Sequence, residues 1–228
     1  MLTKKKKLSK KEIKQDKLVE TYYKAYGYFE ENKSKMLSYG VVLVVIVFAV
    51  IYYINHKKEN NEKAEVLLSQ VMNLYDQGSY LEAIEGRPSQ NISGLKKIVE
   101  DYGSTENGET AKIYLANSYD MLGKPDDALK YYSDYDGDIS IYKAAALAGQ
   151  AGIYAGRKEY EKAAELFKKA SRISKTDVLN PDYMLNASIN YINSGKDGEA
   201  KEVLESIKKD YPTSQANSQA EQYLAIVD

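Results

Sequence analysis

The 228-residue chain is 43% hydrophobic and carries a formal charge of −1, so it has ample apolar material for a folded core. It contains no cysteine, which excludes disulfides and thiol nucleophiles. Its single histidine, His56, follows the apolar segment 36–54, directly beside Lys57, which leaves no Ser-His-Asp triad and no His/Cys metal site. Without a glycine-rich phosphate loop either, the sequence predicts a protein that is not an enzyme and uses no cofactor or metal.

Residues 1–35 form a lysine-rich leader with 11 Lys and 5 acidic residues. The run Lys4 to Lys7 is predicted to be disordered, whereas 12–32 has the spacing of an amphipathic helix. Its apolar face holds Ile13, Leu18, Tyr22, Ala25 and Phe29. Two roles remain open for this helix: it lies at the lipid interface, or it docks a partner protein.

The segment Met36 to Ile54 holds no charged residue across 19 positions. As a helix it would be about 28 Å long, which matches the core of a bilayer. The run is longer than the apolar part of a cleaved signal, and no small-x-small cleavage site follows it. We therefore predict a transmembrane helix over 36–54 that contacts membrane lipid and is retained as a signal-anchor.

Charge predicts the orientation of this anchor. Residues 55–228 keep 21 of the 32 basic and 28 of the 33 acidic residues, a formal charge of −7. Because lysine-rich flanks stay in the cytoplasm, the N-terminus is predicted to be cytoplasmic and 55–228 to be exported. An acidic domain is also a poor ligand for nucleic acid, so none is expected as a partner.

The exported part repeats a helix-turn-helix unit. Equivalent tyrosines stand at Tyr119, Tyr154 and Tyr191, and equivalent alanines at Ala128, Ala163 and Ala200, with periods of 35 and 37 residues. The turns contain Gly123, Gly156 and Gly195. Three repeats are predicted, over 109–140, 144–175 and 181–212.

An irregular repeat over 62–102 precedes them, and a capping helix over 213–228 follows. This irregular repeat is interrupted by 86–94, which is either a surface loop or a binding loop. The predicted fold is therefore all-α: one N-terminal transmembrane helix, then an α-solenoid of about four helical hairpins with a C-terminal cap.

These units resemble the tetratricopeptide repeat family, although the initial Trp of that pattern is missing. The matching residues are Leu115, Ala116, Tyr119, Gly123, Ala128 and Tyr132 in the repeat over 109–140, Ala151, Tyr154, Gly156, Ala163, Phe167 and Ala170 in that over 144–175, and Tyr191, Gly195, Ala200, Leu204 and Pro212 in that over 181–212. The resemblance implies hairpins in which Ala permits close helix contact and an aromatic ring fills the space beside it.

The whole layout over 12–228 resembles the single-span tetratricopeptide proteins of bacteria related to YfgM, the ancillary subunit of the Sec translocon. That resemblance implies a single-pass protein of the bacterial inner membrane with a periplasmic domain. It also implies contact with translocon subunits, periplasmic chaperones or exported chains, although 86–94 departs from a plain repeat array. The alternative is a structural or assembly scaffold of the cell envelope, in division or outer-membrane biogenesis, that uses the same repeat groove.

A groove for a partner peptide or helix is predicted on the concave face, which is lined by the first helix of each hairpin. Its predicted residues are Leu68, Met72, Tyr75, Ile113, Asn117, Asp120, Ala148, Gly152, Ala155, Leu185, Ile189 and Ile192. The alternative is that these residues pack against the capping helix or a second copy of the chain, as in a homo-oligomer.

One segment imitates a calcium loop. Residues 134–140 alternate carboxylates, but Ile139 stands where the turn glycine belongs and Ala145 where a bidentate Glu belongs. We predict a solvated loop between two repeats, with weak ion binding as the alternative.

Overall fold

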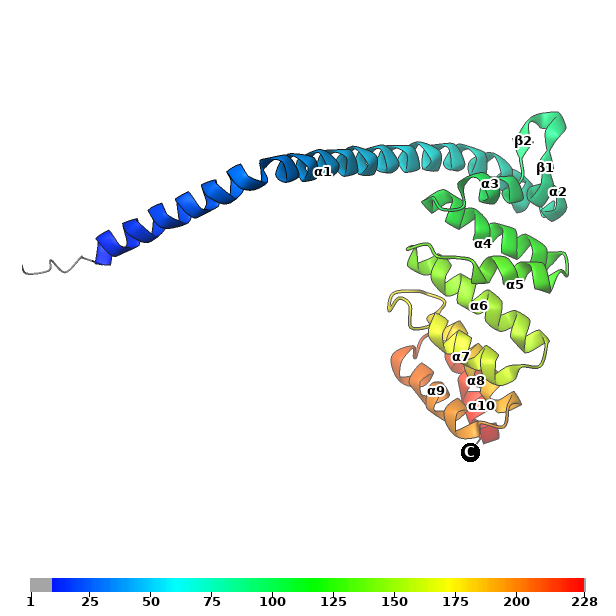
Figure 1. Cartoon of the computed structure of the whole chain (residues 1–228). Helices are drawn as coiled ribbons and strands as arrows, with labels where there is room; N and C mark the ends of the chain where they lie inside the picture. Colours follow the sequence, from blue (N-terminus) through cyan, green and yellow to red (C-terminus); the bar gives the residue numbers. More distant parts are fainter. Residues whose placement is uncertain (1–9, 228) are drawn as a thin grey trace, which may run out of the picture. The chain divides into compact units, whose positions relative to one another are not determined.

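The computed structural model describes residues 10–227, and the side chains of 17–227. The described residues are 81% helical, which confirms the predicted all-α class apart from two short strands. The long helix α1 covers Lys10–Asp76. The remaining elements are α2 (Tyr80–Glu85), β1 (Gly86–Arg87), the 3₁₀ helix η1 (Pro88–Gln90), β2 (Ile92–Ser93), α3 (Leu95–Tyr102), α4 (Glu106–Met121), α5 (Pro125–Ser133), α6 (Ser140–Gly156), α7 (Tyr160–Ala170), α8 (Asn180–Asn193), α9 (Asp197–Asp210) and α10 (Gln215–Val227) (Figure 1). The prediction for Lys4 to Lys7 lies outside the described residues.

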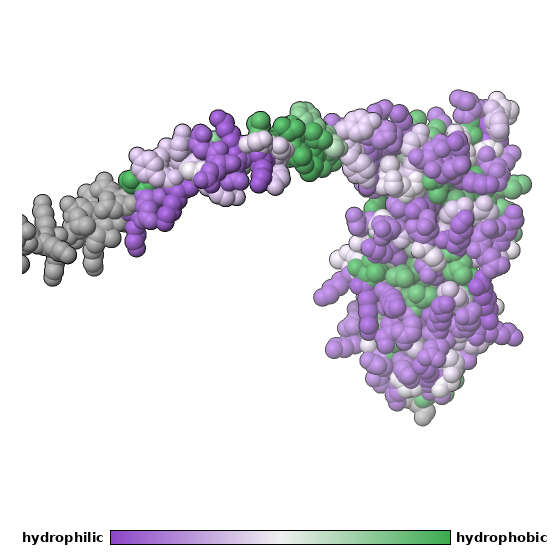
Figure 2. Space-filling model, in the orientation of Figure 1, coloured by the Kyte–Doolittle hydropathy of each residue, from purple (hydrophilic) through white to green (hydrophobic). Residues whose placement is uncertain are grey.

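The chain divides into two units, residues 1–56 and 57–228. In the first unit α1 runs without interruption through the amphipathic and apolar segments, which the sequence treats separately. It contains an 18-residue window with a mean hydropathy of 2.5 whose side chains are all exposed. By length and composition alone this helix could cross a membrane; Figure 2 shows its apolar band between hydrophilic stretches.

The second unit is a series of helical hairpins. The end of α1 packs with α2 and α3, and the pairs α4/α5, α6/α7 and α8/α9 follow as antiparallel hairpins (Figure 1). The helix α10 packs on α8 and α9. Each hairpin buries small residues where its helices meet, including Ala128, Ala163 and Ala200, which are all fully buried. This close approach explains why Ala recurs at one position per repeat.

The segment 86–94, which interrupts the irregular repeat over 62–102, is a small β-hairpin rather than an open loop. Gly86 pairs with Ser93 and Arg87 with Ile92 in antiparallel register. Arg87 donates to the carboxylate of Glu82 and to Gln90, and Ile92 packs on the adjacent core. Gly94 closes the hairpin because a Cβ there would lie 2.2 Å from the carbonyl oxygen of Ile84. The chain thus returns to the helix stack as α3.

The turn within each hairpin uses one residue in the left-handed conformation. It is a glycine in three turns, Gly78, Gly123 and Gly195, with φ between 68° and 76°. In the turn between α6 and α7 it is Lys158, with φ 63°, while Gly156 is the last residue of α6. The assignment of Gly156 as the turn glycine was therefore wrong. The period of 35 residues from Gly123 leads to position 158, which identifies the equivalent residue as lysine.

Candidate functional site

The left-handed turn residues align the first helices of the hairpins, which are the end of α1, α4, α6 and α8. Counted back from these residues, the predicted groove residues fall into three equivalent rows. Row A is Leu68, Ile113, Ala148 and Leu185; row B is Met72, Asn117, Gly152 and Ile189; row C is Tyr75, Asp120, Ala155 and Ile192. Each row therefore has one member from every hairpin.

The structure places row A mostly inside the protein. Leu68, Ile113 and Leu185 are 7%, 2% and 6% exposed and belong to hydrophobic core clusters, while Ala148 is half-buried. These three side chains therefore stabilise the hairpin stack and offer little area to a partner. Rows B and C keep surface: Gly152 and Asp120 are exposed, and the other members are half-buried.

Four tyrosines from successive hairpins form a chain of ring contacts beside rows B and C. The ring centroid of Tyr75 lies 5.6 Å from that of Tyr80 and 5.0 Å from that of Tyr114, both edge to face. Tyr114 in turn meets Tyr142 at 6.2 Å, with their hydroxyl oxygens 3.4 Å apart. All four side chains are half-buried, so aromatic surface remains available next to the groove rows.

Asn117 of row B is held by two of the tyrosines that surround it. Its Oδ1 accepts a hydrogen bond of 2.6 Å from the hydroxyl of Tyr132, and its Nδ2 donates to the hydroxyl of Tyr75 at 3.3 Å. Burial raises the pKa of both the Tyr132 and the Tyr114 hydroxyl well above the ordinary value, so these groups stay neutral. The amide thus fixes the relative position of three helices.

The helix α6 presents small residues where its neighbours present large ones. Gly149 is required for packing, because a Cβ there would lie 2.4 Å from the ring of Tyr132. Gly152, one turn further on, is exposed, and a Cβ there would meet nothing within 4 Å. Together with the half-buried Ala155, it leaves open space on this face of α6.

The C-terminal end of the predicted groove is covered by α10. Leu185 and Ile189 belong to a cluster with Ala220, Tyr223 and Leu224 of that helix. Here the alternative reading, packing against the capping helix, describes the observed contacts. The uncovered part of rows B and C therefore extends from α1 to α6.

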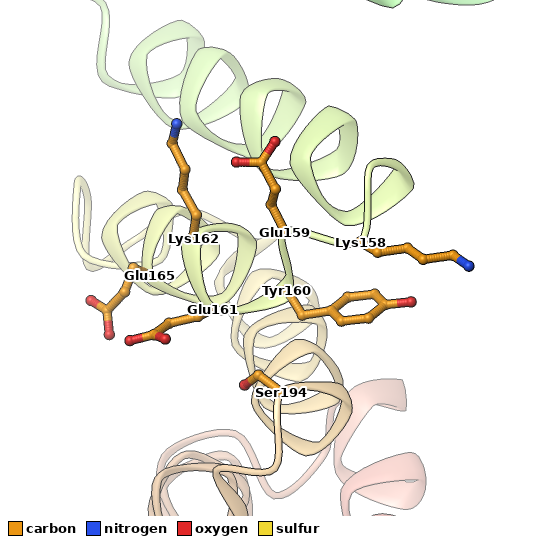
Figure 3. A pocket seen from close by; sticks show the side chains of 7 residues that line it. All are labelled: Lys158, Glu159, Tyr160, Glu161, Lys162, Glu165 and Ser194. Carbon is orange, nitrogen blue, oxygen red and sulfur yellow. The ribbon is translucent and has the colours of Figure 1, made fainter.

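A separate hollow of about 630 Å³ lies at the N-terminal end of α7, next to Ser194 (Figure 3). Three of the charged side chains that line it already contact neighbouring segments of the chain. Glu161 pairs with Lys196 at 2.5 Å, Glu165 accepts a 2.5 Å hydrogen bond from the hydroxyl of Tyr191, and the ammonium of Lys162 lies 3.6 Å from the ring centroid of Tyr154. These contacts fasten α7 to its neighbours on both sides.

The acidic loop between α5 and α6 is organised by Lys112. The Lys112 ammonium lies 2.8 Å from Glu109 and 3.2 Å from Asp134, and Glu109 accepts from the backbone N–H of Asp136 at 2.9 Å. Burial lowers the pKa of Lys112, but these carboxylates outweigh it and raise the pKa overall. Among the described residues, no three acidic, His or Cys side chains are grouped to hold a metal ion.

Comparison with known proteins agrees with this geometry. The tetratricopeptide repeat family matches residues 182–214, which cover α8, α9 and the following turn. The fold is a tetratricopeptide-like solenoid. Similar solved structures are the nearly identical TPR-like repeats of a Podosopora anserina protein assigned as a kinesin light chain, and a single-substitution variant of it. They share 16% identity with this chain, at TM-scores of 0.54 and 0.55, and the matches cover 73% of this chain and 86% and 85% of theirs.

The comparison with curated proteins gives no sequence match. The solved structures establish the solenoid fold and, at this identity, nothing about binding.

Sequence reasoning missed Tyr114 and Tyr142 as neighbours of the predicted groove residues. Both lie on first helices, and Tyr114 precedes the predicted Asn117 by three residues, which places the two on one helix face. That spacing was a usable signal. The contact between Tyr114 and Tyr142 joins two helices and depends on how the hairpins stack, which the sequence pattern does not specify.

Proposed function

We propose that this protein is a membrane-anchored adaptor that binds other proteins through the exposed part of rows B and C. In this proposal 36–54 spans the bacterial inner membrane, with the N-terminus in the cytoplasm and the solenoid in the periplasm. The solenoid acts beside the Sec translocon, where it contacts translocon subunits, periplasmic chaperones or exported chains.

The observation that carries the proposal is the combination of one uncharged, fully exposed helical segment with a solenoid that leaves a face open. The exposed apolar side chains need lipid or another apolar cover. Solenoids of stacked hairpins present extended surfaces suited to peptides and helices of partners. The lysine excess before the span supports a cytoplasmic N-terminus.

The topology can be tested by cysteine labelling, because the chain has no cysteine of its own. Thr21→Cys lies before the apolar segment and Ser218→Cys lies on α10, and both positions are exposed. A membrane-impermeant maleimide applied to intact spheroplasts is expected to label Ser218→Cys alone. Labelling of Thr21→Cys alone would reverse the orientation, and labelling of both without permeabilisation would contradict the anchor.

The partner class can be tested by co-purification from native membranes. Gly152→Glu adds a charged side chain to the open part of row B, and Gly198→Glu adds the same side chain to an open position on α9. We expect translocon subunits, chaperones or exported chains to be recovered with the wild type and with Gly198→Glu, and to be lost with Gly152→Glu. Recovery of envelope-assembly proteins alone would favour a scaffold and contradict the translocon role.

A further inference from the structure

We propose that the N-terminal part of the groove contains a docking site for a lysine or arginine side chain of the bound protein segment. The site is formed by Tyr75, Tyr80 and Tyr114 together with the carboxylates of Asp76 and Asp120, and we call it the tyrosine–aspartate cluster. The proposal rests on the proposed function, because it describes the partner that the same groove accepts.

The aromatic half of the cluster comes from the ring contacts of the first two hairpins. Tyr75 is central: it meets Tyr80 and Tyr114 edge to face at 5.6 Å and 5.0 Å, and Asn117 fixes its hydroxyl. Edge-to-face packing leaves ring faces pointing in different directions, and the faces carry the negative part of the ring quadrupole. Because the three side chains are half-buried rather than enclosed, a cation can approach them.

The acidic half lies on the same helices. Asp76 directly follows Tyr75, and Asp120 lies one turn beyond Asn117 on α4. Both carboxylates are exposed, and neither is in an ion pair with a described residue. Burial is the main cause of the raised pKa values of Tyr75, Tyr114 and Tyr132; the charge of Asp76 adds to the first two and that of Asp120 to the third. Tyr132 lies outside the cluster but shares Asn117 with Tyr75 through hydrogen bonds.

The two carboxylates lie where the helix dipole disfavours a negative charge. Asp76 is the last residue of α1 and Asp120 is the penultimate residue of α4. The C-terminal end of a helix is the negative end of its dipole, so a carboxylate there is unfavourable. Asp120 belongs to row C, whose α6 and α8 members are the uncharged Ala155 and Ile192.

The charge of the surrounding helices favours a basic occupant. Across the first helices of the four hairpins (57–76 of α1, then α4, α6 and α8), seven exposed residues are acidic and four are lysines. They are Glu59, Glu62, Glu65, Asp76, Glu106, Asp120 and Asp182, and Lys57, Lys58, Lys63 and Lys143. Lys63 is paired with Glu59 at 2.7 Å. This excess of acid attracts a basic segment and repels an acidic one. The adjoining open space at Gly152 and Ala155 would take apolar side chains of the same segment.

The test uses the full-length protein in a neutral detergent and a short peptide with an N-terminal Trp and a Leu-Arg-Leu centre. Because the protein contains no Trp, the peptide's fluorescence anisotropy reports binding without background. The Arg peptide is expected to bind about fivefold more tightly than versions with Gln or Glu in its place. That preference should shrink when NaCl is raised from about 0.05 M to about 0.5 M.

Variants separate the cluster from the rest of the groove. The double variant Asp76→Asn with Asp120→Asn is expected to bind the Arg and Gln peptides equally, while Asp127→Asn, the same change on the second helix α5, keeps the preference. Tyr114→Phe should keep it because the ring remains, and Tyr114→Leu should weaken it. Removing the carboxylates of Asp76 and Asp120 from the C-terminal ends of their helices should not lower the urea midpoint. Lost binding in the double variant then cannot come from unfolding.

Two results would overturn the cluster while leaving the groove intact. They are equal affinity of the wild type for the Arg and Gln peptides, and an unchanged Arg preference in the double variant, in either case with binding still abolished by Gly152→Glu. If no peptide of any charge binds, both the cluster and the proposed groove are contradicted.

Discussion

Lys158 holds the left-handed turn conformation that glycine holds in the three equivalent turns. A side chain in this conformation is strained by roughly 1 kcal/mol. Lys158→Gly is therefore expected to stabilise the protein by up to about 1 kcal/mol, measured as a rise in the urea midpoint. Gly123→Ala should lower it, and Gly156→Ala, within α6, should not. A lower midpoint for Lys158→Gly would contradict the turn assignment.

Gly149 and Gly152 lie one turn apart on α6 but differ in what surrounds them. Gly149→Ala would drive a methyl group into the ring of Tyr132, so we expect destabilisation by about 1–3 kcal/mol. Gly152→Ala meets open space and should be neutral or slightly stabilising, because Ala favours the helix. Thermal unfolding of the two variants checks this packing, and equal effects would mean that Tyr132 does not lie against α6.

Titratable groups in the solenoid predict a loss of stability in alkali. Burial raises the pKa of Tyr132, and the carboxylates around Lys112 raise its pKa against the opposing effect of burial. Near and above about pH 10 the unfolded chain binds fewer protons than the folded one, so rising pH favours unfolding. The stability contribution of both groups is complete below that pH.

The urea midpoint should therefore begin to fall at about pH 10 and be lower at about pH 11 than at about pH 9. Tyr132→Phe should have a lower midpoint at the start, because its hydrogen bond to Asn117 is lost, and a shallower fall with pH. An identical slope in the variant would contradict the contribution of Tyr132.

At the scale of the elements, α10 is expected to stabilise the end of the solenoid. Ala220 is fully buried in the cluster with Leu204 and Ile207, whereas Ala225 of the same helix is exposed. Ala220→Glu should destabilise the protein by about 2 kcal/mol or more, because the charge cannot be buried without a partner. Ala225→Glu is the matched control and should unfold like the wild type. Equal midpoints would show that α10 is not packed in solution.

The sequence predicted the helical hairpins because each repeat carries its own packing residues, such as Ala128 with Tyr132. It missed the β-hairpin because β1 and β2 have two residues each, too few for a period to appear. The sequence also predicts separate helices over 12–32 and 36–54, whereas both segments belong to the single helix α1. A change from polar to apolar composition does not by itself end a helix.

For a similar reason, only some of the predicted groove residues lie at the surface: those of rows B and C, but not most of row A. The repeat spacing identified equivalent rows on the first helices, but burial of row A depends on how neighbouring hairpins stack. Ile113 is 2% exposed because helices from adjacent hairpins enclose it, and this is not visible in the pattern of one helix. The ring contacts around Tyr75 likewise join residues up to 39 positions apart.

At the scale of the whole molecule, the apolar segment of α1 and the open face of the solenoid can be tested separately. The exposed side chains of the apolar segment require an apolar environment. The open face of the solenoid lies on the first helices from α1 to α6. The tyrosine–aspartate cluster depends on the open face alone, so it can be tested in detergent without reference to topology.

The most direct measurement of the central claim is site-specific photo-cross-linking in native membranes. A photoreactive residue at Gly152 would extend from the open part of row B, and one at Gly198 would extend from α9 as the control. We expect cross-links from Gly152 to translocon subunits, chaperones or exported chains, and none of these from Gly198. The same products from both positions, or only cross-links between copies of the chain at Gly152, would contradict the proposed groove.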